Sequence, residues 1–295
     1  MFCCSLIFFL QATNISANET FLKYKRNNIT VIYPESLQHV IPDIIDAFHR
    51  AKNNLHTIFV WSIHKPVRLI IIKNRHDFLK RAEHPLVVAF ANPSRNIITM
   101  NYQAVIENPF SLETTLQHEL CHILLGEHLN MHIPRWLNEG IAQWASEGIT
   151  EIIRLDKNIL QKAAFSGNLI PFHRLNYSFP MDDTSFELAY EQSQSFIVYL
   201  VREYHKSSLF QMLELMKSGQ SLHTAIRSVY GKSMHQLEYE WVSSQTQYLA
   251  WILFVINNLY TFLFVGMALI SILGYIRMKR RKWNYPDDWD ADMLQ

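Results

Sequence analysis

The sequence of 295 residues has little cysteine, little glycine and almost no net charge. Its three cysteines are Cys3, Cys4 and Cys121, and the first two lie in an apolar N-terminal stretch. The rest of the chain therefore holds one thiol and no internal disulfide, so a hydrophobic core must stabilise its fold. Only six glycines precede residue 249, which favours a fold rich in helices. The formal net charge is +1, so the chain lacks the excess of basic residues that is typical of nucleic-acid-binding proteins. We therefore expect no nucleic-acid partner.

Formal charge is absent from residues 241–276, a gap of 36 residues. Within it, residues 249–276 exceed the roughly 20 apolar residues that a helix needs to cross a bilayer. Two asparagines interrupt the first half, so we expect the buried part toward residues 259–276. The basic run RMKRRK at 277–282 follows, and such a flank marks the cytoplasmic side. We predict a single-pass membrane protein with a transmembrane helix at 249–276, a cytoplasmic tail at 277–295 and its main domain periplasmic or otherwise extracytoplasmic.

An apolar run from Phe2 to Leu10 predicts a secretory signal peptide in residues 1–18. Small and polar residues follow this run, with candidate cleavage points near Ala12 or Ala17. The positively charged region that normally begins such a peptide is missing. Export of the main domain agrees with the topology that the basic flank predicts.

Apolar periodicity between these end segments predicts a small sheet followed by helices. Strands are expected at residues 28–33, 67–72, 86–91 and 96–101, and helices at residues 35–59 and 74–82. Further helices are expected at residues 111–126, 135–146, 150–165, 184–204, 207–217, 221–229 and 233–245. The predicted fold class is α+β, with a small N-terminal mixed sheet and helices in residues 19–110. A mainly helical subdomain in residues 111–247 follows, and then the transmembrane helix.

The motif H-E-x-x-H occupies residues 118–122 within this helical part. Residues four apart on a helix share a face, so His118 and His122 can both direct an imidazole at one ion. Glu119 can reach the water-occupied position of that ion and act as a general base. The spacing is typical of zinc hydrolases, so the expected cofactor is Zn²⁺.

A zinc site of this kind needs a third protein ligand, for which His128, His132 and Glu139 are candidates. His128 has the spacing of metzincins, although the glycine that permits the required turn comes one place late, at Gly126, after Leu125. His132 fits no ligand spacing and is expected in a loop. Glu139 falls on a predicted apolar helix face, where a carboxylate is costly unless it is paired or bound to metal. The residues alone leave His128 and Glu139 open.

The stretches LQHELCHILLG and IPRWLNEGIAQW together resemble the gluzincins, particularly the peptidase MA-like family. LAYEQSQSFIVYLVREY and AIRSVYGKSMHQLEYEW match in order further on, so that the resemblance covers about residues 29–241. One departure is Gln143, which stands where thermolysin-like gluzincins have an acid. The resemblance implies a gluzincin-like fold, a peptide or protein substrate, the zinc ligands His118, His122 and Glu139, and Glu119 as the base.

The resemblance also names Tyr190 as the group that stabilises the oxyanion, with Gln192 or His173 behind it. The strand Ile97–Asn101 is expected to pair with an extended peptide. Cys121 is expected to be a small buried residue of the core. Seven further histidines show no ligand spacing and are expected at the surface: His56, His64, His76, His84, His205, His223 and His235.

Two hypotheses of function follow from these residues. The first is a membrane-anchored zinc peptidase that hydrolyses peptide bonds outside the cytoplasm, with a metzincin-type site using His128 as its variant. The second is a non-catalytic, gluzincin-like interaction module on the membrane. The intact Glu119 favours the first, because a binding module has no need of a general base. A transporter is disfavoured by the single membrane-crossing segment.

Overall fold

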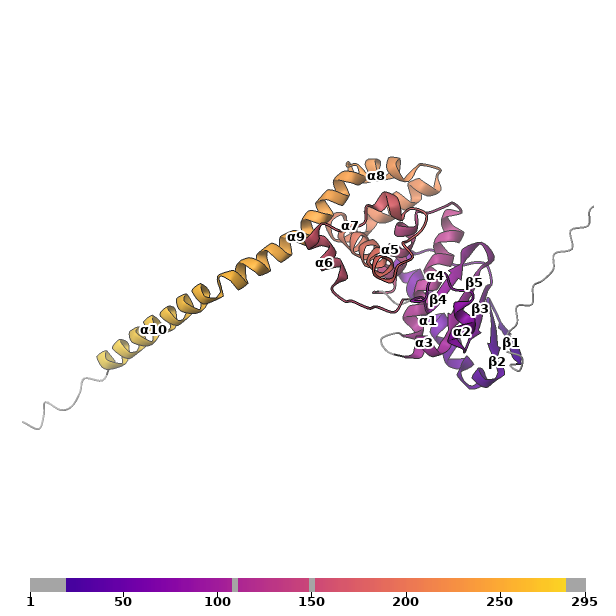
Figure 1. The fold of residues 1–295 in the computed structure, drawn as a ribbon, viewed down its shortest axis with the longest axis horizontal. Coiled ribbons are helices and arrows are strands. Elements are labelled where there is room, and N and C mark those ends of the chain that lie inside the picture. Colours follow the sequence, from indigo (N-terminus) through magenta and orange to yellow (C-terminus); the bar gives the residue numbers. More distant parts are fainter. Residues whose placement is uncertain (1–19, 108–110, 149–151, 285–295) are drawn as a thin grey trace, which may run out of the picture. The chain divides into compact units, whose positions relative to one another are not determined.

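Figure 1 shows the fold in a computed structural model that describes residues 20–107, 111–148 and 152–284. The chain divides into two compact units, one ending at Val242 and the other beginning at Ser243. The described residues are mixed α and β, mostly helical, with a small N-terminal sheet as predicted. The predicted signal peptide and residues 285–295 of the predicted tail lie outside the described residues.

Five strands form one mixed sheet in the first unit, in the order β1-β2-β3-β5-β4. β2, β3 and β5 run parallel to one another, whereas β1 and β4 are antiparallel to their neighbours at the two edges. Side chains of β3 alternate, with Val67, Leu69 and Ile71 buried in the core. The strands are β1 (Phe21–Arg26), β2 (Ile29–Pro34), β3 (Val67–Ile72), β4 (Ala89–Asn92) and β5 (Ile97–Asn101).

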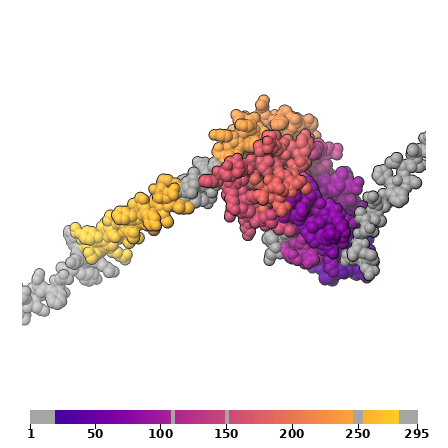
Figure 2. Space-filling model, in the orientation of Figure 1, coloured from indigo at the N-terminus to yellow at the C-terminus, as the bar shows by residue number. Residues whose placement is uncertain are grey.

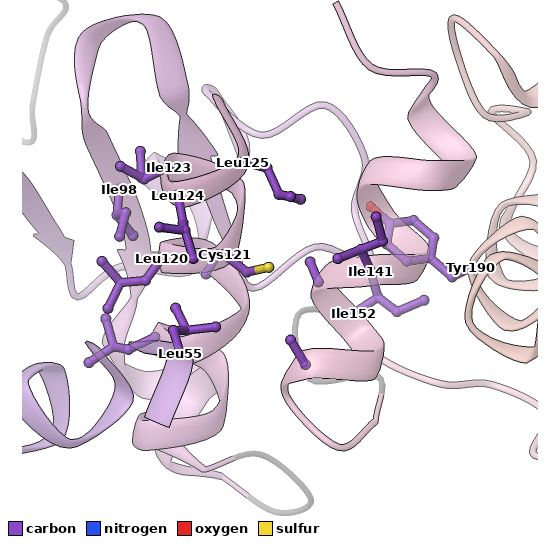
Figure 3. Packing of buried hydrophobic residues seen from close by; sticks show 14 of the residues in the cluster. Leu55, Ile98, Leu120, Cys121, Ile123, Leu124, Leu125, Ile141, Ile152 and Tyr190 are labelled. Carbon is purple, nitrogen blue, oxygen red and sulfur yellow. The ribbon is translucent and has the colours of Figure 1, made fainter. Parts of the chain in front are cut away.

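Two long helices, α1 (Ile41–Phe59) and α4 (Leu112–Leu129), pack against each other and share one hydrophobic core with the sheet. Figure 3 shows Leu120 and Leu124 of α4 in this core, with Leu55 of α1 and Ile98 of β5. A short 3-10 helix, η1, precedes α1, and Pro42 stands in the first turn of α1. The other short elements here are η1 (Glu35–Val40), α2 (Arg75–Leu79), η2 (Pro93–Arg95) and α3 (Tyr102–Ile106).

The helical part of the first unit is organised around α5 (Arg135–Ala145) and α7 (Asp183–Lys217), which pack along each other. α7 contains a break at His205, with φ 67° and ψ 156°, so the two helices predicted in this region are both present. In the space-filling view, the sheet residues and the helical residues of this unit lie directly against each other (Figure 2). The remaining elements are α6 (Ile159–Ser166), η3 (Phe172–Leu175) and α8 (Leu222–Tyr230), and α9 (Met234–Asn257) begins in this unit and continues past Val242.

Three expectations about local structure were wrong. β1 was not predicted. The helix expected at residues 150–165 begins only at Ile159, because Ile152 bridges to Val87 in extended conformation. The carboxylate of Glu187 accepts the backbone N–H groups of Leu155 and the following residue at 3.0–3.2 Å, which holds this segment outside a helix. The third error concerns β5, which pairs with β3 and β4 and is therefore not an edge strand.

The second unit contains α10 (Leu259–Asn284). Its stretch Leu259–Arg280 has a mean hydropathy of 2.1 and is long and apolar enough to cross a membrane. None of that stretch is buried in the structure. By length and composition it is a candidate membrane span, and it begins where the two asparagines of the sequence led us to expect.

Candidate metal centre and its cleft

Three of the predicted site residues lie together where α4 packs against α5. His118 and His122 are one turn apart on α4, and their Nε2 atoms are 3.0 Å from each other. Glu139 comes from α5, and its Oε2 atom lies 3.5 Å from Nε2 of His118 and 3.4 Å from Nε2 of His122. All three side chains are buried. They are the group of metal-ligating residues that the described part of the chain brings within reach of one ion.

The spacing of these donor atoms fits a tetrahedral zinc ion. Bonds of roughly 2.0–2.2 Å at tetrahedral angles place neighbouring ligand atoms about 3.3–3.6 Å apart. The two separations to Glu139, 3.4 and 3.5 Å, fall in this range, and the 3.0 Å between the two histidines is slightly shorter. Two imidazoles and one carboxylate also form the donor set of catalytic zinc sites that keep a position open for water. The residues present therefore fit the ion that the sequence predicts.

Asn138 supports one of the imidazoles from behind. Its Oδ1 lies 3.2 Å from Nδ1 of His122. An amide oxygen accepts a hydrogen bond, so this contact places the proton on Nδ1 and leaves the Nε2 lone pair directed at the cluster. Asn138 immediately precedes Glu139, so α5 supplies both the candidate ligand Glu139 and the residue that orients the candidate ligand His122. Sequence reasoning missed this residue, although its position beside Glu139 could have pointed to it.

The electrostatics of the cluster favour a positive charge between these groups. Burial alone would raise the pKa of Glu139, but the two histidines hold it well below its usual value. Burial alone would likewise lower the pKa of His122, yet Glu139 raises it to about 9. Burial lowers the pKa of His118. A carboxylate that remains ionised at this depth needs a cation beside it, which is the condition a metal ion meets.

A cleft of about 440 Å³ opens onto the cluster. Glu119, which is 1% exposed, lines it beside the two histidines. Tyr190 of α7 also lines it, and its ring is held edge-on to Phe179 at a centroid distance of 5.1 Å. The structure therefore brings the predicted base and the predicted oxyanion donor into the same cleft as the three candidate ligands.

The sheet edge that borders the cleft is β4. Ala89 and Ala91 line the cleft, whereas the carbonyl of Val88 accepts a hydrogen bond from the amide of Asn101 at 2.9 Å. Because backbone groups of successive residues in a strand point in opposite directions, Ala89 and Ala91 present theirs on the side away from β5. The expectation that β5 would offer an edge to a peptide is thus corrected to β4.

One cation forms part of the cleft wall close to the cluster. Arg135 lies four residues before Glu139 on α5, and its Nε atom is 3.9 Å from Oε1 of that glutamate. Its Nη1 atom donates to Glu83 at 2.6 Å. Burial alone would lower the pKa of Arg135, but Tyr190, Glu83 and Glu139 raise it. Arginine at this position has no motif that would have marked it in the sequence.

The other candidate ligands and donors lie elsewhere. His128 stacks on Trp61 at a centroid distance of 3.7 Å, and its Nε2 is 2.7 Å from Glu214. His132 stacks on Tyr177 at the cleft without joining the cluster of ligands described here. Gln192 bonds the backbone of Ile170 through both ends of its amide, at 2.8 and 2.9 Å. His173 is exposed and does not line the cleft in the described structure.

Two further expectations concern buried residues. Cys121 is fully buried, as predicted, and Figure 3 shows it among the apolar side chains of α4. Burial raises the pKa of its thiol, so the group stays protonated at neutral pH. His84 was expected at the surface and is 1% exposed. It stacks on Phe186 at 3.7 Å, and its Nδ1 accepts the amide of Leu86.

Comparison with solved structures finds zinc peptidases. The chain is similar to the M1 zinc metallopeptidase from Deinococcus radiodurans, with 16% identity over 76% of this chain and 51% of that one, at a TM-score of 0.42. It is also similar to Legionella pneumophila aminopeptidase A in complex with aspartic acid, with 13% identity over 76% and 28%, at a TM-score of 0.42. The chain thus spans about half the length of the first and less of the second. No curated protein sequence matches the chain.

A family model described as the Peptidase MA superfamily matches residues 51–247, which is 197 of the 295 residues. The matched region contains α4, α5, α7 and the whole candidate metal centre. It also contains β4, the edge strand beside the cleft. Since two thirds of the chain match, the chain belongs to the Peptidase MA superfamily, the family that its motifs resemble.

Proposed function

We propose that this protein is a zinc-dependent peptidase that is anchored in a membrane and hydrolyses peptide bonds outside the cytoplasm. The observation that carries the proposal is the meeting of His118, His122 and Glu139 at 3.0–3.5 Å. Glu119 and Tyr190 stand in the same cleft. A buried cluster of this composition beside an open cleft has no evident structural role.

The proposed organisation follows the boundaries expected from the sequence. Residues 1–18 act as a signal peptide, residues 19–110 form an α/β subdomain, and residues 111–247 form a helical zinc-peptidase subdomain. Residues 249–276 hold the membrane anchor, and residues 277–295 form a cytoplasmic tail. The candidate span Leu259–Arg280 supports the anchor.

In the proposed reaction, a peptide binds in extended conformation beside β4. Among the described residues no backbone group pairs with Ala89 or Ala91 on this side, and their backbone groups pair with the peptide in the manner of an added strand. This pairing would hold one peptide bond over the floor of the cleft, where the three candidate ligands lie. A substrate fixed in this way has already lost its translational and rotational entropy on binding, so the chemical step does not have to lose it.

Glu119 is the general base of this mechanism. It accepts a proton from the attacking water and later returns it to the departing amine. A zinc ion held by His118, His122 and Glu139 would supply Lewis acidity and a water with its pKa lowered to about 7. Tyr190 donates a hydrogen bond from its hydroxyl group to the oxygen of the attacked carbonyl as negative charge develops there. Asn138 keeps His122 in the tautomer that this arrangement requires.

The test uses the full-length protein purified in detergent. Zinc per chain is measured by elemental analysis, and hydrolysis is measured on a mixture of internally quenched peptides. We expect about one zinc per chain in the wild type. We also expect its loss in Glu139→Ala and its retention in the matched control His128→Ala, whose histidine lies outside the cluster.

The variant Glu119→Gln separates chemistry from metal binding. It removes the base but no candidate ligand, so we expect zinc content to be kept while the rate falls by about 10²–10⁴-fold. Wild-type protein that binds no zinc, or a Glu119→Gln variant that hydrolyses peptides at the wild-type rate, would overturn the proposed function. Zinc binding without hydrolysis in the wild type would favour the interaction module.

A further inference from the structure

The two oxygens of Glu139 face different partners. Oε2 lies 3.4–3.5 Å from the Nε2 atoms of the two histidines. Oε1 lies on the side of Arg135, whose Nε is 3.9 Å away. Residues four apart on a helix stand on one face, so Arg135 and Glu139 are neighbours by the geometry of α5 itself.

Arg135 is held in place from three directions. Its Nη1 donates to Oε1 of Glu83, in the segment before β4, at 2.6 Å. Its guanidinium carbon lies 4.7 Å above the ring centre of Phe179. Its backbone amide donates to the carbonyl of Asn176 at 2.7 Å. Only 17% of the side chain is exposed, so the planar guanidinium has little freedom to leave this position.

Several other charged and titratable groups line the same cleft. They are Arg81, Glu83, Glu119, His118, His122, His132, Tyr177 and Tyr190. Arg81 is exposed, whereas Arg135 is the cation for which the structure gives a close approach to Glu139. Attraction between a guanidinium and a carboxylate at this separation is substantial in a partly buried site, where the effective dielectric constant is well below that of water.

We propose that Arg135 is a positioning residue of the metal centre. It attracts Oε1 of Glu139 and so leaves Oε2 alone to face the ion. Without this attraction the carboxylate would rotate more freely, and that freedom would be lost when Oε2 binds the ion, which weakens binding. Arg135 thereby raises the affinity for the ion, and Glu83 and Phe179 keep Arg135 in place. The inference rests on the proposed function, because it requires that Glu139 bind the ion.

A merely structural role for Arg135 predicts different results. In that case the Glu83–Arg135 ion pair would tie the segment before β4 to α5, and its loss would lower stability without changing metal affinity. Mutation of a residue that supports a metal ligand typically lowers metal affinity by about 10–100-fold. The zinc dissociation constant and the melting temperature of the metal-free protein therefore separate the two roles.

The experiment measures the zinc dissociation constant of the full-length protein in detergent by competition with a chromogenic chelator. The variants are Arg135→Gln, Arg135→Lys and Glu83→Gln. Arg202→Gln is the matched control, since Arg202 also pairs with a glutamate, at 2.7 Å, and lies over a tyrosine ring, but it does not line the cleft. Melting of each metal-free protein is followed by circular dichroism.

We expect Arg135→Gln to raise the dissociation constant about 10–100-fold, while the melting temperature of the metal-free protein changes little. Arg135→Lys should recover part of the affinity, because lysine keeps the positive charge but lacks the planar guanidinium with its several N–H donors. Glu83→Gln should show a smaller loss than Arg135→Gln, and Arg202→Gln none. A dissociation constant for Arg135→Gln within twofold of the wild type would overturn the inference. If Arg135→Gln does not fold, Arg135→Lys and Glu83→Gln decide, and wild-type affinity in both would overturn it. Failure of wild type to bind zinc would instead overturn the proposed function.

Discussion

Replacing Gly140 by alanine tests a close approach between α5 and α7. A Cβ atom on residue 140 would lie 2.4 Å from the carbonyl oxygen of Ser193 and 2.7 Å from Cγ1 of Ile197. Real Cβ atoms essentially never come within 3.0 Å of a non-bonded heavy atom from elsewhere in the fold, and the nearest obstacle here is backbone. The two helices must therefore move apart.

The size of the effect follows from two opposing contributions. Overpacking of this kind costs about 1–3 kcal/mol. Alanine is favoured over glycine in a helix interior by about 1 kcal/mol, which offsets part of that cost. Because the nearest obstacle is backbone, we take the upper end of the overpacking range and expect a net loss of about 2 kcal/mol in the free energy of unfolding. Because Gly140 follows Glu139, the same movement displaces the candidate ligand carboxylate, so zinc affinity should fall as well.

The assay is chemical unfolding of the metal-free, full-length protein in detergent, followed by near-ultraviolet circular dichroism. Gly126→Ala is the comparison. There the nearest atom is Cβ of Pro93 at 2.7 Å, while the nearest backbone atom is 3.9 Å away, so the short η2 segment can yield. We expect a smaller loss for Gly126→Ala. A Gly140→Ala variant that is as stable as the wild type and binds zinc equally well would refute the reasoning.

Three other predictions follow from the structure. Trp136→Ala should lower the free energy of unfolding in urea by about 3–5 kcal/mol, because the indole is 1% exposed and its Nε1 donates to Asn176 at 3.1 Å. A loss below about 1 kcal/mol would contradict the place of Trp136 in the core. Zinc at about 100 times its dissociation constant should stabilise the wild type by about 2.7 kcal/mol in a melting series, and an equal gain in His122→Ala would argue against the site. The hydrogen bond from Lys232 lowers the pKa of Glu240, so this carboxylate adds stability above its unfolded pKa near 4 and loses it as the pH falls through the folded value. Glu240→Gln should therefore cost about 0.5 kcal/mol or less at pH 7, since the pair is exposed, and less than that at pH 3; an equal cost at both values would show that charge is not the cause.

Local sequence correctly predicted the helices and strands whose pattern of apolar residues matches their burial in the fold. β3 lies where the run of branched apolar residues placed it, at Val67–Ile72, and α5 ends within one residue of its expected boundary. β1 was missed because Lys23 and Lys25 interrupt its apolar residues. Lysine is tolerated there since β1 is an edge strand, and the position of a strand within a sheet is not contained in its own sequence.

The remaining errors come from partners distant in the sequence. His84 is buried because Phe186, about 100 residues later in the chain, supplies the ring that covers it. Nothing within ten residues of His84 indicates such a neighbour. Asn138 and Arg135 acquire their contacts to the candidate metal centre in the same way, through the packing of α5 on α4 and on the segment that contains Glu83. Their residue types are common on helix surfaces, so local pattern could not have selected them.

The choice between His128 and Glu139 depends on where α4 ends. The sequence left it open because a turn after Leu125 would have returned His128 to the ion. In the structure α4 continues to Leu129 and is capped by Asn130 in the left-handed conformation. On a continuous helix, six residues correspond to a rotation of about 240°, so His128 faces away from His122. To reach the ion it would have to unwind the last turn of α4 and give up its stacking on Trp61 and its bond to Glu214. Glu139 reaches the two histidines without any such rearrangement, since α5 already packs against α4.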